Sequence, residues 1–330
     1  MNTPINPRID MKTRSKLLIL NMIRRNGACS RIDLSSKIGI TKSAVTLLTA
    51  EMLQDGLLTE GAEGSLIQQK RGRRKVLLTI DPNCRLAFGA SIGDHFLTIG
   101  LSNLRGDSLE HIQIDIRGIH YRAVLGMLFE RVQQMIHDNY LPSNHILGIG
   151  VVLEDRAANL IEGGGGAEKL ARLKRDLAYA VKIPIITART ASGALIAQRL
   201  FYGENTRHAV LLHCDEAPPI EVGILLNGRP YSGVRGQLGS DFRTVSGTLS
   251  ERAAHMAALY AQLIDPEKIF LCGRFFHEES MLQSVSEQAV KIAGRPITML
   301  RAAVKDDYLH LCGCAICVER CFYLDSMQGV

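Results

Sequence analysis

The chain has 330 residues and a net charge of +6, from 39 Lys and Arg against 33 Asp and Glu. A chain that is 46% hydrophobic and 22% charged has the composition of a globular protein. No apolar stretch reaches the length of a membrane span, and the polar N-terminus does not have the pattern of a secretory signal. We therefore expect a cytoplasmic protein with no membrane partner, built as a small module and a body of two lobes.

The positive charge is concentrated in residues 1–80. They contain fourteen Lys and Arg and six Asp and Glu, whereas the other 250 residues contain 25 basic and 27 acidic side chains. Clustered basic residues gain affinity for a duplex because they release counterions from its phosphates. Charge alone is equally compatible with a solvated basic surface, so the local pattern has to decide.

That pattern predicts a helix-turn-helix. Residues 12–25 carry apolar side chains at helical spacing and are followed by Asn26 and Gly27, a helix stop. Ser30 and Asp33 have the spacing of a capping box, which starts a short second helix.

The third helix is the one expected to read bases. After a turn at residues 39–40, Thr41 is its N-cap, and it runs over residues 42–54. Three of its apolar side chains are expected in the core: Val45, Leu48 and Met52. On or near its outer face we expect Lys42, Ser43, Thr46 and Thr49. Short donors and a Lys at the start of such a helix suit the major groove.

A basic hairpin completes the module. Strands are expected at residues 56–60 and 76–80, and the basic segment 68–75 lies between them. Its Arg-Gly-Arg centre is suited to a narrow minor groove, although a disordered basic loop is the alternative. The predicted DNA contacts of the winged helix are Ser30, Arg31, Thr41, Lys42, Ser43, Thr46, Thr49, Lys70, Arg71, Gly72, Arg73 and Arg74.

The module resembles the N-terminal domain of the ROK-family sugar repressors, which respond to glucose, N-acetylglucosamine and xylose. The resemblance rests on residues 30–34, the helix at 41–53 and the Arg-Gly-Arg wing. Four later segments are similar to landmarks of the ROK domain, at residues 88–93, 148–150, 222–228 and 265–273. The resemblance implies an α/β protein with a winged helix-turn-helix at residues 1–81. Residues 82–330 would then form a shortened actin-like ATPase (ROK) fold of two lobes for sensing and dimerisation.

Residues 82–330 have an α/β pattern independently of the family resemblance, because strand-like runs alternate with helical segments. The expected strands are at 96–101, 145–152, 183–186, 209–212 and 268–271, and the expected helices at 123–137, 191–201 and 248–264. Pro82 favours a joint between the wing and the body.

Several family motifs are altered in ways that remove kinase chemistry. The resemblance places Asp94 in the first phosphate-binding turn, where its carboxylate would repel a phosphate. It places Pro218, Pro219 and Glu221 in the second, where prolines remove backbone donors. Arg189 stands at the position of the catalytic Asp, and a guanidinium cannot accept a proton at neutral pH. We therefore expect no enzyme activity.

The sugar and zinc motifs are altered as well. Gln237 stands where the family has the sugar-binding Glu, and Ser240 where it has a zinc-binding His. The family's zinc cysteines are missing after Ser240, so we expect neither a structural zinc nor a cofactor. What remains is a degenerate ligand pocket comprising Arg189, Glu221, Gln237 and Ser240.

Four cysteines near the C-terminus are open to two interpretations. Cys312, Cys314, Cys317 and Cys321 have a spacing that suggests a zinc or iron–sulfur site. They also lie where the ROK fold has a tightly packed closing helix, and small cysteines suit such packing. We favour packing, and leave metal binding and redox sensing open.

The sequence thus predicts a DNA-binding transcriptional regulator. The family resemblance implies that it is a repressor and that it controls carbohydrate metabolism. Its expected partners are double-stranded DNA with an inverted-repeat operator, a second copy in a homodimer or dimer of dimers, and a small-molecule effector or protein partner. The alternative is a ROK-fold sugar-binding protein or sugar kinase with an accessory DNA-binding domain. The operator, the regulated genes and the sign of regulation stay open.

Overall fold

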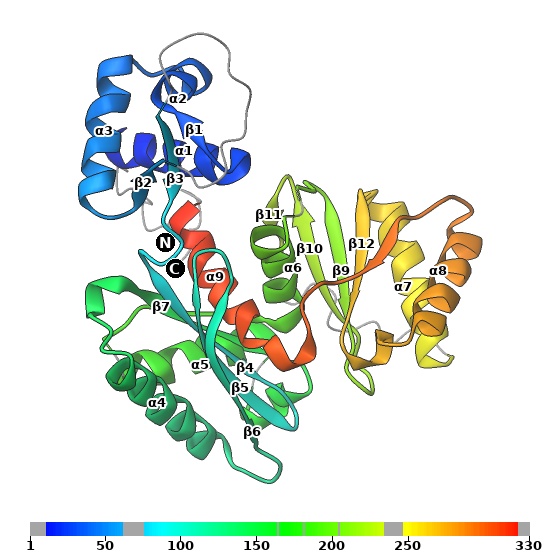
Figure 1. The fold of residues 1–330 in the computed structure, drawn as a ribbon. Helices are drawn as coiled ribbons and strands as arrows, with labels where there is room; N and C mark the ends of the chain where they lie inside the picture. The colour runs from blue at the N-terminus through cyan, green and yellow to red at the C-terminus, as the bar shows by residue number, and fades with distance from the viewer. Residues whose placement is uncertain are drawn as a thin grey trace, which may run out of the picture. The chain divides into compact units, whose positions relative to one another are not determined.

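The computed structural model describes residues 11–61, 76–163, 165–180, 182–203, 205–233 and 247–322. It divides into two compact units (Figure 1). One contains the chain up to Arg85 together with the segment from Val318 onward, and the other contains Leu86–Cys317. The first unit therefore includes the end of the chain as well as its beginning. The boundary after residue 81 stays a prediction.

The N-terminal unit packs three helices against a small antiparallel sheet of order β1-β3-β2. Its elements are α1 (Met11–Asn26), β1 (Cys29–Ser30), α2 (Arg31–Ile38), α3 (Lys42–Gln54), β2 (Leu58–Glu60) and β3 (Leu77–Ile80). The expected helix-turn-helix is confirmed: Gly39 ends α2 with a φ of 77°, and Thr41 caps α3 by accepting a hydrogen bond from the Ala44 amide. The core of the unit includes Ile19, Ile23, Leu34, Val45, Leu48, Met52, Leu58 and Leu78.

Strand β1 has no signal in the sequence. It is two residues long, and Cys29 and Ser30 pair with Leu78 and Leu77 of β3. A strand this short has no alternating pattern, and only its partner across the sheet defines it.

The body contains two five-stranded sheets. The first, of order β6-β5-β4-β7-β8, comprises β4 (Leu86–Ile92), β5 (Phe96–Asn103), β6 (Ser108–Asp115), β7 (Ile146–Leu153) and β8 (Ile185–Arg189). The second, of order β11-β10-β9-β12-β13, comprises β9 (Ala209–His213), β10 (Glu221–Leu226), β11 (Arg229–Pro230), β12 (Lys268–Cys272) and β13 (Met299–Arg301).

The two sheets have the same topology. Each begins with three consecutive antiparallel strands and then adds two parallel strands beside the first of them. The sequence shows no repeat that announces this duplication, because each lobe fills the same topology with different side chains. A pair of lobes built in this way is the actin-like architecture expected for the body.

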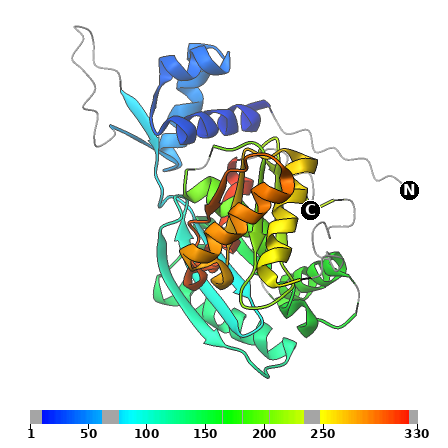
Figure 2. The same cartoon turned by 90° about the vertical axis from the view of Figure 1, so that its right-hand side faces the viewer.

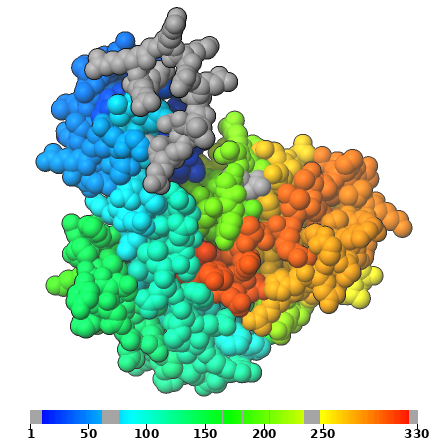
Figure 3. All heavy atoms as spheres, in the orientation of Figure 1, coloured from blue at the N-terminus to red at the C-terminus, as the bar shows by residue number. Residues whose placement is uncertain are grey.

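Helices separate and cover the two sheets. Helices α4 (Tyr121–Asp138) and α5 (Gly166–Ala180) cover the outer side of the first sheet, whereas α7 (Leu249–Ile264) and α8 (Glu279–Ala293) cover that of the second (Figure 2). Between the sheets lie α6 (Thr190–Phe201) and the first turns of α9 (His310–Phe322). Figure 3 shows the segment leading into α9, in orange-red, between the lobes. Within the described ranges, no helix has both the length and the apolar character needed to cross a bilayer.

The remaining elements are short 3-10 turns that connect strands and helices. They are η1 (Ser143–His145), η2 (Ala157–Leu160), η3 (Arg274–Phe276) and η4 (Asp306–Tyr308). The last two each supply a charged side chain, Arg274 and Asp306, to the pocket between the lobes.

Glycines bring α9 against the first sheet. A Cβ at Gly313 of α9 would lie 2.2 Å from the Gly150 carbonyl oxygen of β7, and a Cβ at Gly89 would lie 1.9 Å from the His310 carbonyl oxygen. Cys312, Cys314 and Cys317 are buried in this tightly packed helix. Burial raises the pKa of the Cys314 thiol to about 12. The cysteines therefore pack as small, neutral thiols.

We expect Gly313→Ala to lower the free energy of unfolding by about 2 kcal/mol or more, because the added methyl group overlaps backbone that cannot move aside. The matched control is Gly126→Ala in α4, where an added Cβ meets no atom within 4 Å. That change should raise stability by up to about 1 kcal/mol through helix propensity. Urea unfolding of both variants measures the difference, and equal effects would contradict this account of how α9 packs.

Candidate nucleic-acid interface and inter-lobe site

The outward face of α3 carries polar side chains at its start. Thr41, Lys42, Ser43 and Thr46 are exposed, whereas Val45 on the opposite side is fully buried. The acidic Glu51 of the same helix turns toward α1, where its carboxylate binds Lys12 Nζ at 2.8 Å and Lys16 Nζ at 3.0 Å. The start of α3 thus presents a cation and short hydroxyl groups to the outside, without Glu51 opposing them.

Thr49 does not belong to this face, and its placement on or near the outer face is wrong. The side chain is fully buried, and its Oγ1 donates to the Val45 carbonyl oxygen at 2.8 Å. The reason is helical periodicity: Thr49 lies four residues after Val45 and three before Met52, which puts it on the core stripe.

Two further predicted contacts hold the module together instead. Ser30 is 3% exposed, and its hydroxyl donates to Asp33 Oδ2 at 2.6 Å at the start of α2. The Arg31 guanidinium donates to Thr49 Oγ1 at 3.0 Å and to Glu60 Oε1 at 2.6 Å, which links α2 to α3 and β2. The Ser30 side chain is therefore unavailable for base contacts, and the Arg31 side chain is committed to internal partners.

The predicted wing contacts lie outside the described residues; they are Lys70, Arg71, Gly72, Arg73 and Arg74. Two members of the predicted ligand pocket, Gln237 and Ser240, also lie outside the described residues. Their roles stay predictions.

The last turn of α9 contributes to the N-terminal unit, which no local sequence pattern indicates. Asn21 of α1 donates a side-chain hydrogen bond to the Phe322 carbonyl oxygen, and the Arg24 guanidinium lies 5.4 Å from the centre of the Phe322 ring. A cation over an aromatic face is attractive. The last turn of α9 is therefore part of the packing around α1.

In the body, Arg189 is part of a buried charge network. Its Nε donates to Asp155 Oδ1 at 2.9 Å, and a second donor, Nη2, binds Asp155 Oδ2. Glu221 at the start of β10 accepts hydrogen bonds from the Asp155 amide at 2.7 Å and from the Ala191 amide at 3.3 Å. Because Asp155 follows β7 and Glu221 begins β10, this network joins the two lobes.

The network includes a backbone amide at the start of α6. The Ala191 amide lies in the first turn of α6, and the amides at a helix N-terminus are a common binding site for phosphate or carboxylate anions. Here the chain's own Glu221 carboxylate occupies such amides. Arg189 is an ion-pair partner in a position where the family has a proton acceptor, so the geometry agrees with the loss of a catalytic base.

The carboxyl group of Glu154 in this region has a strongly raised pKa. Burial raises its pKa to about 8, and the negative charges of Glu221 and Asp215 raise the pKa further. A hydrogen bond from the Asp94 amide and the positive charge of Arg156 lower the pKa in part. At neutral pH the Glu154 side chain is therefore mainly protonated, so it avoids placing an unpaired charge between the lobes.

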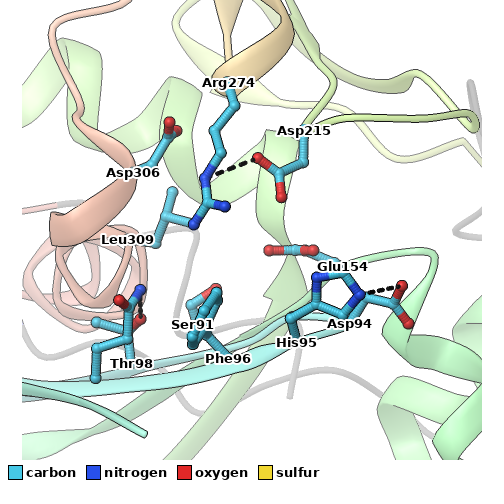
Figure 4. A pocket seen from close by; sticks show the side chains of 12 residues that line it. Ser91, Asp94, His95, Phe96, Thr98, Glu154, Asp215, Arg274, Asp306 and Leu309 are labelled. Carbon is cyan, nitrogen blue, oxygen red and sulfur yellow. Dashed lines mark hydrogen bonds and ion pairs between the residues drawn. The ribbon is translucent and has the colours of Figure 1, made fainter. Parts of the chain in front are cut away.

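Both lobes line a small pocket beside Glu154 (Figure 4). Asp94 from the first hairpin pairs with Arg156 at 2.7 Å. From the other lobe, Arg274 pairs with Asp215 at 3.5 Å and Glu216 at 3.2 Å. The lining residues are Ser91, Gly93, Asp94, His95, Phe96, Thr98, Gln113, Glu154, Asp215, Arg274, Asp306 and Leu309. The cavity holds about 20 Å³, which is room for about one water molecule.

The residues that line this pocket do not form a metal centre. Among the side chains in the described part of the chain, no group of three or more His, Cys, Asp or Glu has the arrangement to hold a metal ion. Its charges instead form pairs within the protein, as Asp94 does with Arg156.

The fold defines a class of protein: a winged-helix module joined to an actin-like body of two lobes. Residues 12–60 match the MarR family model. A crystal structure of a ROK-family transcriptional regulator, a homolog of the Escherichia coli MLC protein, matches 96% of this chain and 98% of its own with a TM-score of 0.67 and 19% identity. The fold and the order of domains are those of the ROK-family transcriptional regulators.

The chain is also similar to a repressor and to a sugar kinase. The xylose repressor of Caldicellulosiruptor bescii is 24% identical over 235 residues, which are 69% of this chain and 58% of that repressor. The chain therefore spans less than two thirds of that relative's length. A ROK-family glucokinase from Streptomyces griseus, solved with glucose and AMPPNP, matches 69% of this chain and 98% of its own, with a TM-score of 0.57 and 12% identity. It shares the fold of the body.

We expect the stability of the Glu154→Gln variant to depend less on pH between about 5 and 8 than that of the native chain. The folded pKa of about 8 lies above the ordinary value of 4.5, so only the folded state holds this proton between those values. The free energy of unfolding of the native chain should accordingly fall by about 1.4 kcal/mol per pH unit through this group as pH rises toward 8.

Urea unfolding at several pH values between 5 and 8 measures this effect as the difference between native and variant curves. Glu130→Gln on the exposed side of α4 controls for the loss of one negative charge. If the curves for Glu154→Gln and the native chain stay parallel, Glu154 does not carry the proton in the folded state.

Proposed function

We propose that this chain is a DNA-binding transcriptional regulator, a repressor of the ROK type, that acts in the cytoplasm. The observation that carries the proposal is the start of α3, where Thr41, Lys42, Ser43 and Thr46 form an exposed polar face. The first residues of a recognition helix are those that meet base edges in the major groove. The excess of basic residues in the first eighty positions supplies the phosphate attraction.

The working unit in this proposal is a homodimer, or a dimer of dimers, on an inverted-repeat operator. A single winged helix covers few base pairs and gains affinity and specificity by pairing. Two-fold protein symmetry requires a pseudo-palindromic site, whose half-site spacing the body would set. The similarity to a xylose repressor supports a role in carbohydrate metabolism.

The body in this proposal serves pairing and sensing. The altered residues of the predicted ligand pocket, among them Arg189 and Glu221, favour an effector other than a standard hexose, or control by a protein partner. Calorimetric titration with a panel of sugars separates the two kinds of control, because only a ligand-controlled body releases or takes up heat on binding one of them.

The alternative is a ROK-fold sugar-binding protein or sugar kinase with an accessory DNA-binding domain. Phosphoryl transfer needs a base for the sugar hydroxyl and a cradle for phosphates. The family resemblance assigns Arg189 to the position of the base and Asp94 and Glu221 to the phosphate-binding turns, and Arg189 pairs with Asp155. These contacts argue against the alternative.

We expect the full chain to select a pseudo-palindromic duplex from a random pool. Replacing Lys42 with Ala should relax the sequence preference at one position of each half-site, because the start of α3 is the part that meets base edges. Fluorescence anisotropy with the selected duplex and with its single base-pair variants measures the preference. Lys291→Ala on the exposed side of α8 is the matched control. An unchanged preference in Lys42→Ala would show that Lys42 does not read a base.

We also expect no transfer of phosphate from ATP to any hexose, and no gain of transfer in Arg189→Asp. Restoring a carboxylate at residue 189 leaves Glu221 at the start of α6 and puts a second acid beside Asp155. A coupled assay for ADP release measures the activity. Turnover in the native chain that a change in Glu221 abolishes would favour the kinase alternative.

A further inference from the structure

The exposed face of α3 contains an apolar side chain that the polar pattern does not explain. Leu47 is 62% exposed, although Leu48 beside it is buried. Leu47 lies one turn after Ser43 and one turn before Ala50, both of which are exposed and small. It therefore projects from the middle of the face and is not covered by larger neighbours on its own helix.

The hydroxyl groups near Leu47 already have partners within the module. Thr46 Oγ1 donates to the Lys42 carbonyl oxygen at 2.8 Å. Ser43 Oγ lies 3.2 Å from Thr41 Oγ1, and the two hydroxyls share a hydrogen bond. The polar side chains can still accept hydrogen bonds, but part of their donor capacity is used in the free protein. Leu47 is the largest apolar group that this face presents to a partner.

We propose that Leu47 is a specificity-determining residue that packs against the 5-methyl group of a thymine in the major groove. This inference rests on the proposed function and names one base contact within it. Thymine is the base whose major-groove edge carries a methyl group, and apolar side chains are its natural contact. Exposed leucines are common on protein surfaces. Leu47 differs from them because it occupies the sixth position of a recognition helix.

The contact discriminates in two ways. Burying the leucine against a methyl group removes apolar surface of both partners from water. A cytosine at the same position would bring its amino group against a side chain with no acceptor, which leaves a donor without a partner. Leu47 thus favours thymine through burial and disfavours cytosine through an unmade hydrogen bond.

The test uses a duplex that the full-length chain selects from a random pool. Each thymine in that duplex is replaced in turn by deoxyuridine, which removes the methyl group and keeps the base pair. For the native chain we expect affinity to fall about fourfold at one position in each half-site, the effect of one buried methyl-sized group. Fluorescence anisotropy with the native chain, Leu47→Ala and Leu47→Met provides the comparison.

In Leu47→Ala the difference between thymine and uracil at that position should vanish, whereas Leu47→Met should retain it because an apolar side chain of similar size remains. Leu109→Ala, at a 51% exposed leucine of β6 in the body, is the matched control and should behave as the native chain. Unfolding curves establish that each variant folds, which the exposure of Leu47 favours.

The inference is overturned if every thymine can be replaced by uracil without loss, or if Leu47→Ala keeps the full thymine preference. In both cases specific binding by the native chain would still support the proposed function. If the pool yields no enriched duplex at all, the proposed function fails, and the assignment of Leu47 fails with it.

Discussion

The body depends on one buried carboxylate, that of Glu221. It accepts amide hydrogen bonds from Asp155 after β7 and from Ala191 in α6, so it connects the sheet of one lobe to the sheet and helix of the other. Beside it, the Arg189 guanidinium pairs with Asp155. The arrangement is electrostatically feasible because burial keeps the nearby Glu154 protonated, with a pKa of about 8.

This network places a side chain of the protein at a position where many proteins bind anions. Phosphate sites use helix N-termini and glycine-rich turns. Here the Glu221 side chain accepts a hydrogen bond from the Ala191 amide at the start of α6. A Cβ at Gly223 would lie 2.4 Å from the Ala191 carbonyl oxygen, which shows how closely β10 and α6 approach. The glycine serves packing between elements of the body.

Much of the N-terminal unit could be predicted from the sequence, because its helices begin and end with local signals such as Thr41 and Gly39. The exposed face of α3 could be predicted except at Thr49. Its polar side chain suggested an outer position, whereas the helical period places Thr49 in the core. Strand β1 and the Phe322 contacts with α1 depend on partners far along the chain, so no local pattern reveals them. The same holds for the pairing of Arg189 with Asp155, which only the fold brings together.

The central claim is that two copies of the chain associate through their bodies and bind DNA with their two basic modules. Sedimentation of the full-length chain with its selected duplex, combined with hydroxyl-radical footprinting, tests it most directly. The account predicts two copies of the chain per duplex and two protected half-sites related by a pseudo-two-fold axis, about one helical turn or a multiple of it apart. A single copy that protects one asymmetric half-site with full affinity would contradict it.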